Sequence, residues 1–197
     1  MSSLQCPTTI ILARHGEATY ESPTWQPEGG CLTPAGRAQA GALAERLAGR
    51  RIAHVWTSTL ARAVQTAEIA AARLGVSVTT RAGLREFEVG DAAGTPLDED
   101  PFADTYARWL EGELDERIAG GESATEIVGR MSAVLDEIAD QHPGETVLVI
   151  SHGGALRLAV PHWARLEAPP QRLTNCATLE VRADPDDRAC VAWDRPA

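Results

Sequence analysis

Two short apolar runs in this chain each end in a histidine followed by a glycine. Residues 8–13 are apolar and β-branched and lead into Arg-His-Gly at 14–16. Residues 146–150 have the same character and lead into Ser-His-Gly at 151–153. Runs of this length and composition predict buried strands, so the chain is expected to contain two strands that both end in His-Gly.

The segments around these runs alternate between strand and helix patterns. Further strands are predicted at 53–56, 76–80, 177–182 and 189–193. Helices are predicted from a cap at Thr33 to Gly49, from Ser58 to Gly75, from a capping box at Ser123 and Glu126 to Pro143, and directly after Gly153. This alternation favours an α/β fold, a three-layer αβα sandwich with a mostly parallel central sheet. The pattern loosens over about 91–121, where we expect a small, partly helical cap on a single domain of residues 1–197.

Composition excludes several kinds of partner. The formal net charge of -10 argues against nucleic acid or an anionic membrane as the main partner. No apolar segment approaches the length of a membrane span, so we expect a cytoplasmic protein. The four cysteines have no CxxC spacing, which indicates neither a zinc site nor a disulfide framework. The chain has no lysine, so every basic side chain is an arginine, suited to bidentate contact with phosphate or carboxylate oxygens.

The two histidines are expected to lie side by side. Ligands of open α/β sheets bind beyond the carboxyl ends of the strands, and both His15 and His152 follow such ends. The adjacent glycines would let backbone amides approach an anion, and the helix after Gly153 would turn its positive end toward the same place. Arg14 adds a cation, so the sequence predicts a phosphate site.

Several motifs occur in an order that resembles the histidine phosphatase superfamily, in its phosphoglycerate-mutase-like branch. They are ARHGEA, LTPAGRAQA, STLARAVQTA, LREFEVGDAAG, GGES and VISHGGALR, and together they span residues 9 to about 160. The resemblance implies a phosphoglycerate-mutase-like fold and hydrolysis of a small phosphomonoester through a phosphohistidine. It implies no metal and no cofactor.

The resemblance also implies roles for individual residues. His15 would be the nucleophile, and Arg14, Arg62 and His152 would hold the phosphoryl oxygens. Glu86, from its place in the LRE motif, would protonate the leaving oxygen and later activate water, with Glu88 as the alternative acid.

Other positions bear on the substrate and on the rival functions. Thr19, Glu21 and Gly153 are expected among the substrate-binding residues, although many relatives carry a hydroxyl at position 18 and an asparagine at position 21, where this chain has Ala18 and Glu21. A phosphomutase and a phosphate-binding pseudophosphatase remain the alternatives. The nine acidic residues against two arginines over 91–117 favour a phosphatase over a mutase that holds a second anionic group. The sequence leaves the oligomeric state open.

Overall fold

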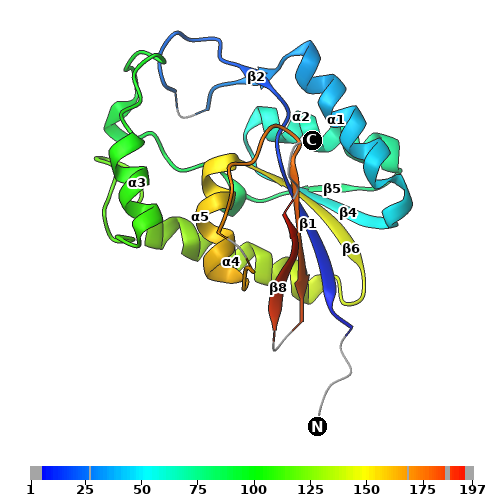
Figure 1. Cartoon of the computed structure of the whole chain (residues 1–197). Coiled ribbons are helices and arrows are strands. Elements are labelled where there is room, and N and C mark those ends of the chain that lie inside the picture. Colours follow the sequence, from blue (N-terminus) through cyan, green and yellow to red (C-terminus); the bar gives the residue numbers. More distant parts are fainter. Residues whose placement is uncertain (1–5, 27, 168, 185–186, 194–197) are drawn as a thin grey trace.

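The central feature of the computed structural model is a six-stranded sheet (Figure 1). The structure describes residues 6–26, 28–167, 169–184 and 187–193. The strand order is β5-β4-β6-β1-β7-β8. These strands are β1 (Thr8–Arg14), β4 (Ile52–Thr57), β5 (Val78–Thr80), β6 (Thr146–Ser151), β7 (Thr178–Ala183) and β8 (Arg188–Trp193). The first four in the order run parallel and β7 and β8 are antiparallel, which confirms the predicted mostly parallel sheet.

Helices cover both faces of the sheet. Alternate residues of β1 contribute to two separate apolar clusters, as expected of a strand buried on both sides. Ile10 and Leu12 face the cluster formed with α4 (Ala124–Gln141) and α5 (Gly153–Trp163). Ile11 and Ala13 face the cluster formed with α1 (Pro34–Leu47) and α2 (Ala61–Leu74). The three predicted layers are therefore present, and Figure 1 shows the two helix pairs on opposite sides of the strands.

The helix boundaries mostly follow the predicted signals. Thr33 caps α1 by accepting a hydrogen bond from the Gly36 amide, and α2 ends at Gly75, which has a left-handed φ of 73°. The prediction that Gly49 ends the first helix is wrong. The α-helix stops at Leu47, and a 3₁₀ turn over Ala48–Arg50 leads into Arg51, which takes the left-handed conformation itself.

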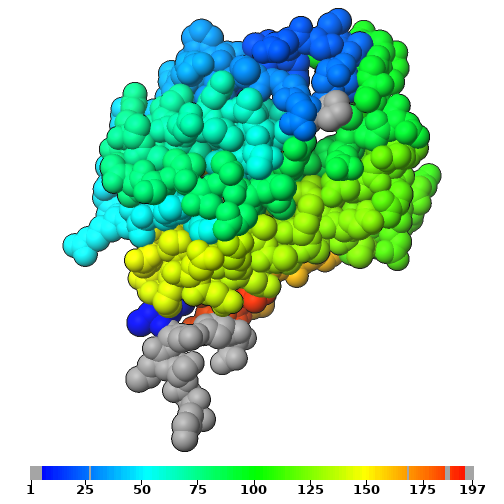
Figure 2. All heavy atoms as spheres, turned by 180° about the vertical axis from the view of Figure 1, so that it is seen from behind, coloured from blue at the N-terminus to red at the C-terminus, as the bar shows by residue number. Residues whose placement is uncertain are grey.

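The segment about 91–121 contains one helix, α3 (Ala103–Glu111), which lies beyond α5 and away from the sheet (Figure 1). This segment meets the loop that connects β2 (Ala18–Thr19) to β3 (Cys31–Leu32), two short strands that pair with each other. The Trp25 amide donates to the Thr95 carbonyl, and the Gly94 amide donates to the Trp25 carbonyl. Figure 2 shows the blue loop and the green segment side by side on the back of the molecule. The two segments thus form one continuous rim.

No helix among the described residues is long and apolar enough to cross a membrane.

The start of α4 provides a test of local stability. Ser123 accepts a hydrogen bond from the Glu126 amide, and the Glu126 carboxylate accepts one from the Ser123 amide. Ser123→Ala should therefore lower the free energy of unfolding by about 1 kcal/mol, measured by urea denaturation. Ser77→Ala, at an exposed position outside any helix, is the matched control and should leave the midpoint unchanged. Equal midpoints for both variants would contradict a stabilising capping box.

Candidate active site

His15 lies at the end of β1 with its two ring nitrogens in different environments. Nδ1 is 2.7 Å from the Gly16 carbonyl oxygen, to which it must donate, since a carbonyl only accepts. Nε2 then carries the lone pair, and it accepts a hydrogen bond from Arg62 Nε at 3.2 Å. The imidazole is therefore held as the Nδ1–H tautomer, with its free nitrogen beside a guanidinium.

Burial keeps this imidazole neutral. The side chain is only 6% exposed, and desolvation, followed by the nearby positive charge of Arg62, lowers the pKa of His15 to about 3. Nε2 consequently stays unprotonated over the whole physiological pH range.

His152 lies beside His15, as the sequence predicts. The rings are 5.1 Å apart between centroids, because β1 pairs with β6 and places Arg14 opposite Ser151. His152 is completely buried, which lowers its pKa well below the ordinary value. Its Nε2 is 2.8 Å from Ser58 Oγ, whereas its Nδ1 has no partner among the described residues, and the ring is not among the residues that line the cavity described below.

Ser58 is a site residue that the sequence analysis missed. It directly follows β4, is completely buried, and also accepts a hydrogen bond from the Leu60 amide at the start of α2. Ser58 therefore fixes both the His152 ring and the helix that carries Arg62. Its position as the first residue of the S-x-x-x-R-x-x-Q-T stretch was the available signal.

The two predicted arginines flank His15. Arg62, 6% exposed, also donates to the Gly29 carbonyl at 2.6 Å, so the loop before β3 holds it in place. Arg14 donates through Nη1 to the Leu173 carbonyl at 3.0 Å, while its buried Nε has no partner among the described residues. Burial lowers the pKa of Arg14 from its ordinary value, although not enough to discharge a guanidinium.

The glycines act differently from the prediction. Gly16 is required by a close approach of backbone, because a Cβ there would lie 2.6 Å from the Gly36 carbonyl oxygen, and its amide donates to Thr66 Oγ1. Gly153 makes room for Arg14, whose Nε would lie 3.3 Å from an added Cβ. These two glycines therefore accommodate protein groups first, although Gly153 also lines the cavity described below.

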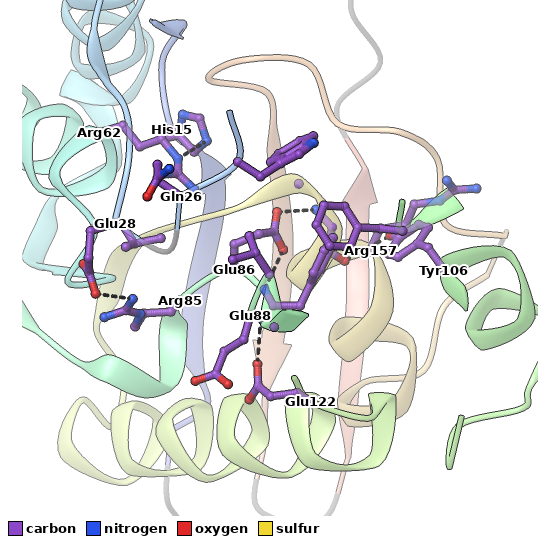
Figure 3. A pocket seen from close by; sticks show the side chains of 18 of the residues that line it. His15, Gln26, Glu28, Arg62, Arg85, Glu86, Glu88, Tyr106, Glu122 and Arg157 are labelled. Carbon is purple, nitrogen blue, oxygen red and sulfur yellow. Dashed lines mark hydrogen bonds and ion pairs between the residues drawn. The ribbon is translucent and has the colours of Figure 1, made fainter. Parts of the chain in front are cut away.

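The positive end of α5 is occupied by Glu86. Its carboxylate accepts hydrogen bonds from the Gly154 amide at 3.0 Å and the Ala155 amide at 2.7 Å (Figure 3). The expected anion at this helix terminus is thus a side chain of the protein. The alternative acid, Glu88, is exposed, and its amide donates to the Glu122 carboxylate farther from His15.

A cavity of about 1060 Å³ opens over these groups. Figure 3 shows Glu86 in its middle, with His15 and Arg62 on one side and Tyr106 and Arg157 on the other. Thr19 and Glu21 are exposed and do not line it, so the cavity gives no support to their predicted contact with substrate. The side chain between them, Tyr20, lines the cavity instead, because neighbouring residues of an extended segment point in opposite directions.

The charges that line the cavity are balanced. Its arginines are Arg14, Arg62, Arg85, Arg130, Arg157 and Arg172, and its carboxylates are Glu28, Glu86, Glu88, Asp91, Asp100 and Glu122. Arg85 pairs with Glu28 and Arg130 pairs with Glu122, each at 2.7 Å. No group of three or more His, Cys, Asp or Glu side chains that could hold a metal ion occurs within the described part of the chain.

Comparison with known proteins gives a matching family model and several similar proteins. Residues 10–196 match the family model of the histidine phosphatase superfamily (branch 1). Phosphoglycerate mutase-like protein 4 of Arabidopsis thaliana is 36% identical over 75% of this chain and 67% of its own length. The probable phosphoglycerate mutase GpmB of Yersinia enterocolitica is 34% identical over 87% of this chain and 83% of its own.

Solved structures share the fold. YhfR of Bacillus stearothermophilus superposes with a TM-score of 0.77 at 27% identity, covering 96% of this chain and 98% of that one. A mycobacterial glucosyl-3-phosphoglycerate phosphatase complexed with VO3 gives a TM-score of 0.78 at 24% identity, covering 95% and 99%. A phosphoserine phosphatase mutant from Entamoeba histolytica gives 0.73 at 23%, covering 95% and 96%.

The buried His15 predicts a loss of stability in acid. Its folded pKa of about 3 lies below the ordinary 6.5, so stability is complete above about pH 6.5 and is lost as the pH falls toward 3. Between about pH 7.5 and 5.0, protonation of this group in the unfolded chain should lower the free energy of unfolding by about 2 kcal/mol. His152 should add to this loss in the same direction.

The measurement is urea denaturation at both pH values. His15→Gln should remove its share of the pH-dependent loss, whereas His162→Gln, on the exposed end of α5, should retain the wild-type difference. An undiminished loss in His15→Gln would contradict the buried neutral imidazole.

Proposed function

Because the chain belongs to the histidine phosphatase superfamily (branch 1), we propose that it is a metal-independent phosphomonoester hydrolase that acts through a phosphohistidine. Its partner would be a small phosphorylated metabolite in the cytoplasm, with residues 1–197 working as one domain and about 91–121 as its cap. The observation that carries the proposal is the His15 ring, whose Nδ1–H is fixed by the Gly16 carbonyl while Nε2 keeps its lone pair.

The first step would transfer the phosphoryl group to His15. Nε2 attacks phosphorus while the bond from phosphorus to the ester oxygen breaks. A proton from Glu86 goes to that oxygen, and the alcohol leaves. Arg62, already in contact with Nε2, and Arg14 would hold the phosphoryl oxygens and stabilise the charge that spreads over them during transfer.

The second step would return the enzyme to its starting state. The Glu86 carboxylate takes a proton from water, the water oxygen attacks phosphorus, and the bond from phosphorus to Nε2 breaks to release inorganic phosphate. The hydrogen bonds from the Gly154 and Ala155 amides hold this carboxylate in one place for both steps. His152 would contribute through Nδ1, its ring being oriented by Ser58.

A phosphomutase is the second candidate, and it is favoured by the names of the relatives. A mutase would pass the phosphoryl group to a second substrate hydroxyl that itself carries anionic groups. Apart from Arg14 and Arg62, the cavity has four arginines against six carboxylates, which disfavours such a substrate. We therefore prefer water as the acceptor. A pseudophosphatase that only binds phosphate is the third candidate.

The test is release of inorganic phosphate from a panel of phosphomonoesters in buffer containing a metal chelator. His15→Ala should reduce release by more than about a thousandfold and should abolish a phosphoenzyme that is labile in acid and stable in base. Its far-ultraviolet circular dichroism should match the wild type.

The outcomes separate the three candidates. Residual activity of His15→Ala near wild type would remove this residue from the mechanism. Transfer of labelled phosphoryl to an added hydroxyl compound faster than to water would establish the mutase. Phosphate binding without phosphoenzyme or release in the wild type would establish the binding role.

The role of Glu86 predicts a dependence on the leaving group. Glu86→Gln should lower kcat/KM for an alkyl phosphate by about a hundredfold or more, because the departing alkoxide needs a proton. The loss should be much smaller for 4-nitrophenyl phosphate, whose leaving group departs as a stable anion. Glu88→Gln is the matched control and should change both values less than about twofold. A larger loss for the alkyl phosphate in Glu88→Gln than in Glu86→Gln would reassign the acid to Glu88.

A further inference from the structure

The aromatic side chains of this protein are concentrated at the cavity. The chain has five Trp, two Tyr and two Phe, and five of these nine side chains line it: Tyr20, Trp25, Phe87, Phe102 and Tyr106. Resting on the proposed function, we propose that these rings bind the leaving group, and that the substrates are phosphomonoesters whose alcohol carries a flat, uncharged aromatic ring.

Two of the rings lie directly beside Glu86. A Cβ added to Gly154 would lie 2.7 Å from Phe87 Cε1 and 2.9 Å from Glu86 Oε1. The Phe87 ring and the Glu86 carboxylate therefore both lie close to the Cα atom of Gly154. The Tyr106 hydroxyl donates to the Gly154 carbonyl at 3.1 Å. An alcohol that receives a proton from Glu86 therefore has aromatic surface next to it.

The rings continue into one wall that crosses three segments of the chain. Phe87 and Tyr106 have centroids 5.9 Å apart, and Phe87 and Phe102 meet edge to face at 5.5 Å. Trp25, from the loop after β2, meets Phe102 edge to face at 5.1 Å. These distances and angles are the ones aromatic pairs prefer, so an additional ring from a ligand can join the same arrangement.

One ring of the wall belongs to the core that supports it, because Phe102 is 4% exposed and lies in the same apolar cluster as Trp109. Trp109, 1% exposed, packs behind Phe87 and Tyr106 at 5.8 and 6.1 Å and fills the interior of the cap. Phe87, Tyr106 and Trp25 stay half-buried and retain surface toward the cavity.

The carboxylates that line the cavity also favour an uncharged leaving group. The Trp25 side chain donates to the Glu99 carbonyl, and Asp100 and Asp91 line the cavity near this rim. With the excess of carboxylates beyond Arg14 and Arg62, a second phosphate on the leaving group would be repelled, whereas a neutral ring would not.

The experiment compares benzyl, cyclohexylmethyl and propyl phosphates, whose alcohols have similar acidity and so demand similar help from Glu86. For the wild type, kcat/KM for benzyl phosphate should exceed kcat/KM for propyl phosphate by about tenfold or more, mostly through a lower KM. It should also exceed kcat/KM for cyclohexylmethyl phosphate by several-fold. Trp25→Leu should reduce the ratio of kcat/KM for benzyl phosphate to kcat/KM for propyl phosphate to within about twofold.

The control variant is Trp193→Leu, whose side chain lies in β8 and does not line the cavity, and it should keep the full preference. Equal kcat/KM values for the benzyl and propyl compounds, or a preference that survives Trp25→Leu, would overturn the aromatic subsite and leave the phosphatase intact. No phosphate release from any of the three compounds, together with none from the wider panel, would instead refute the proposed function.

Discussion

The parallel pairing of β1 with β6 is the constraint on which the site depends. Its register sets Ala13 opposite Ile150 and Arg14 opposite Ser151, so the next residue of each strand is a histidine at the same edge of the sheet. Apolar residues on both faces fix that register, since a slip of one position would turn Ile10 and Leu12 toward the wrong helices. Nothing local to either His-Gly sequence could bring the two rings within 5.1 Å.

Burial then determines what these rings can do. Two histidines beside two arginines would repel one another if all four carried charge. Desolvation and the guanidinium of Arg62 keep His15 neutral, and complete burial does the same for His152. The cations that remain are guanidiniums, which stay charged when partly buried. One site can therefore hold a nucleophilic imidazole and fixed positive charge together.

Much of this arrangement could be predicted from the sequence because its signals are local. The apolar strand runs, the capping box at Ser123 and the left-handed Gly75 each depend on a few neighbouring residues, and the structure confirms them. The pairing of His15 with His152 followed from a general rule about the edges of parallel sheets. Long-range contacts could not be read in the same way. No local pattern marks Ser58 as the partner of His152, nor Glu86 as the group that occupies the start of α5.

The loop after β2 is a second region whose side-chain contacts could not be predicted from local sequence patterns. Its sequence has no clear period, so the directions of the Thr19, Tyr20 and Glu21 side chains could not be derived from it. Of the three, Tyr20 lines the cavity. Thr19 pairs with Cys31 in the ladder of β2 and β3, and backbone hydrogen bonds join Trp25 to the segment at 94–95. His15 and His152 are thus positioned by the sheet, whereas the aromatic wall of the cavity is built from segments that hold each other. If the proposed function holds, substitutions in those segments should change which alcohol is accepted, because His15 and its carbonyl partner belong to a different part of the fold.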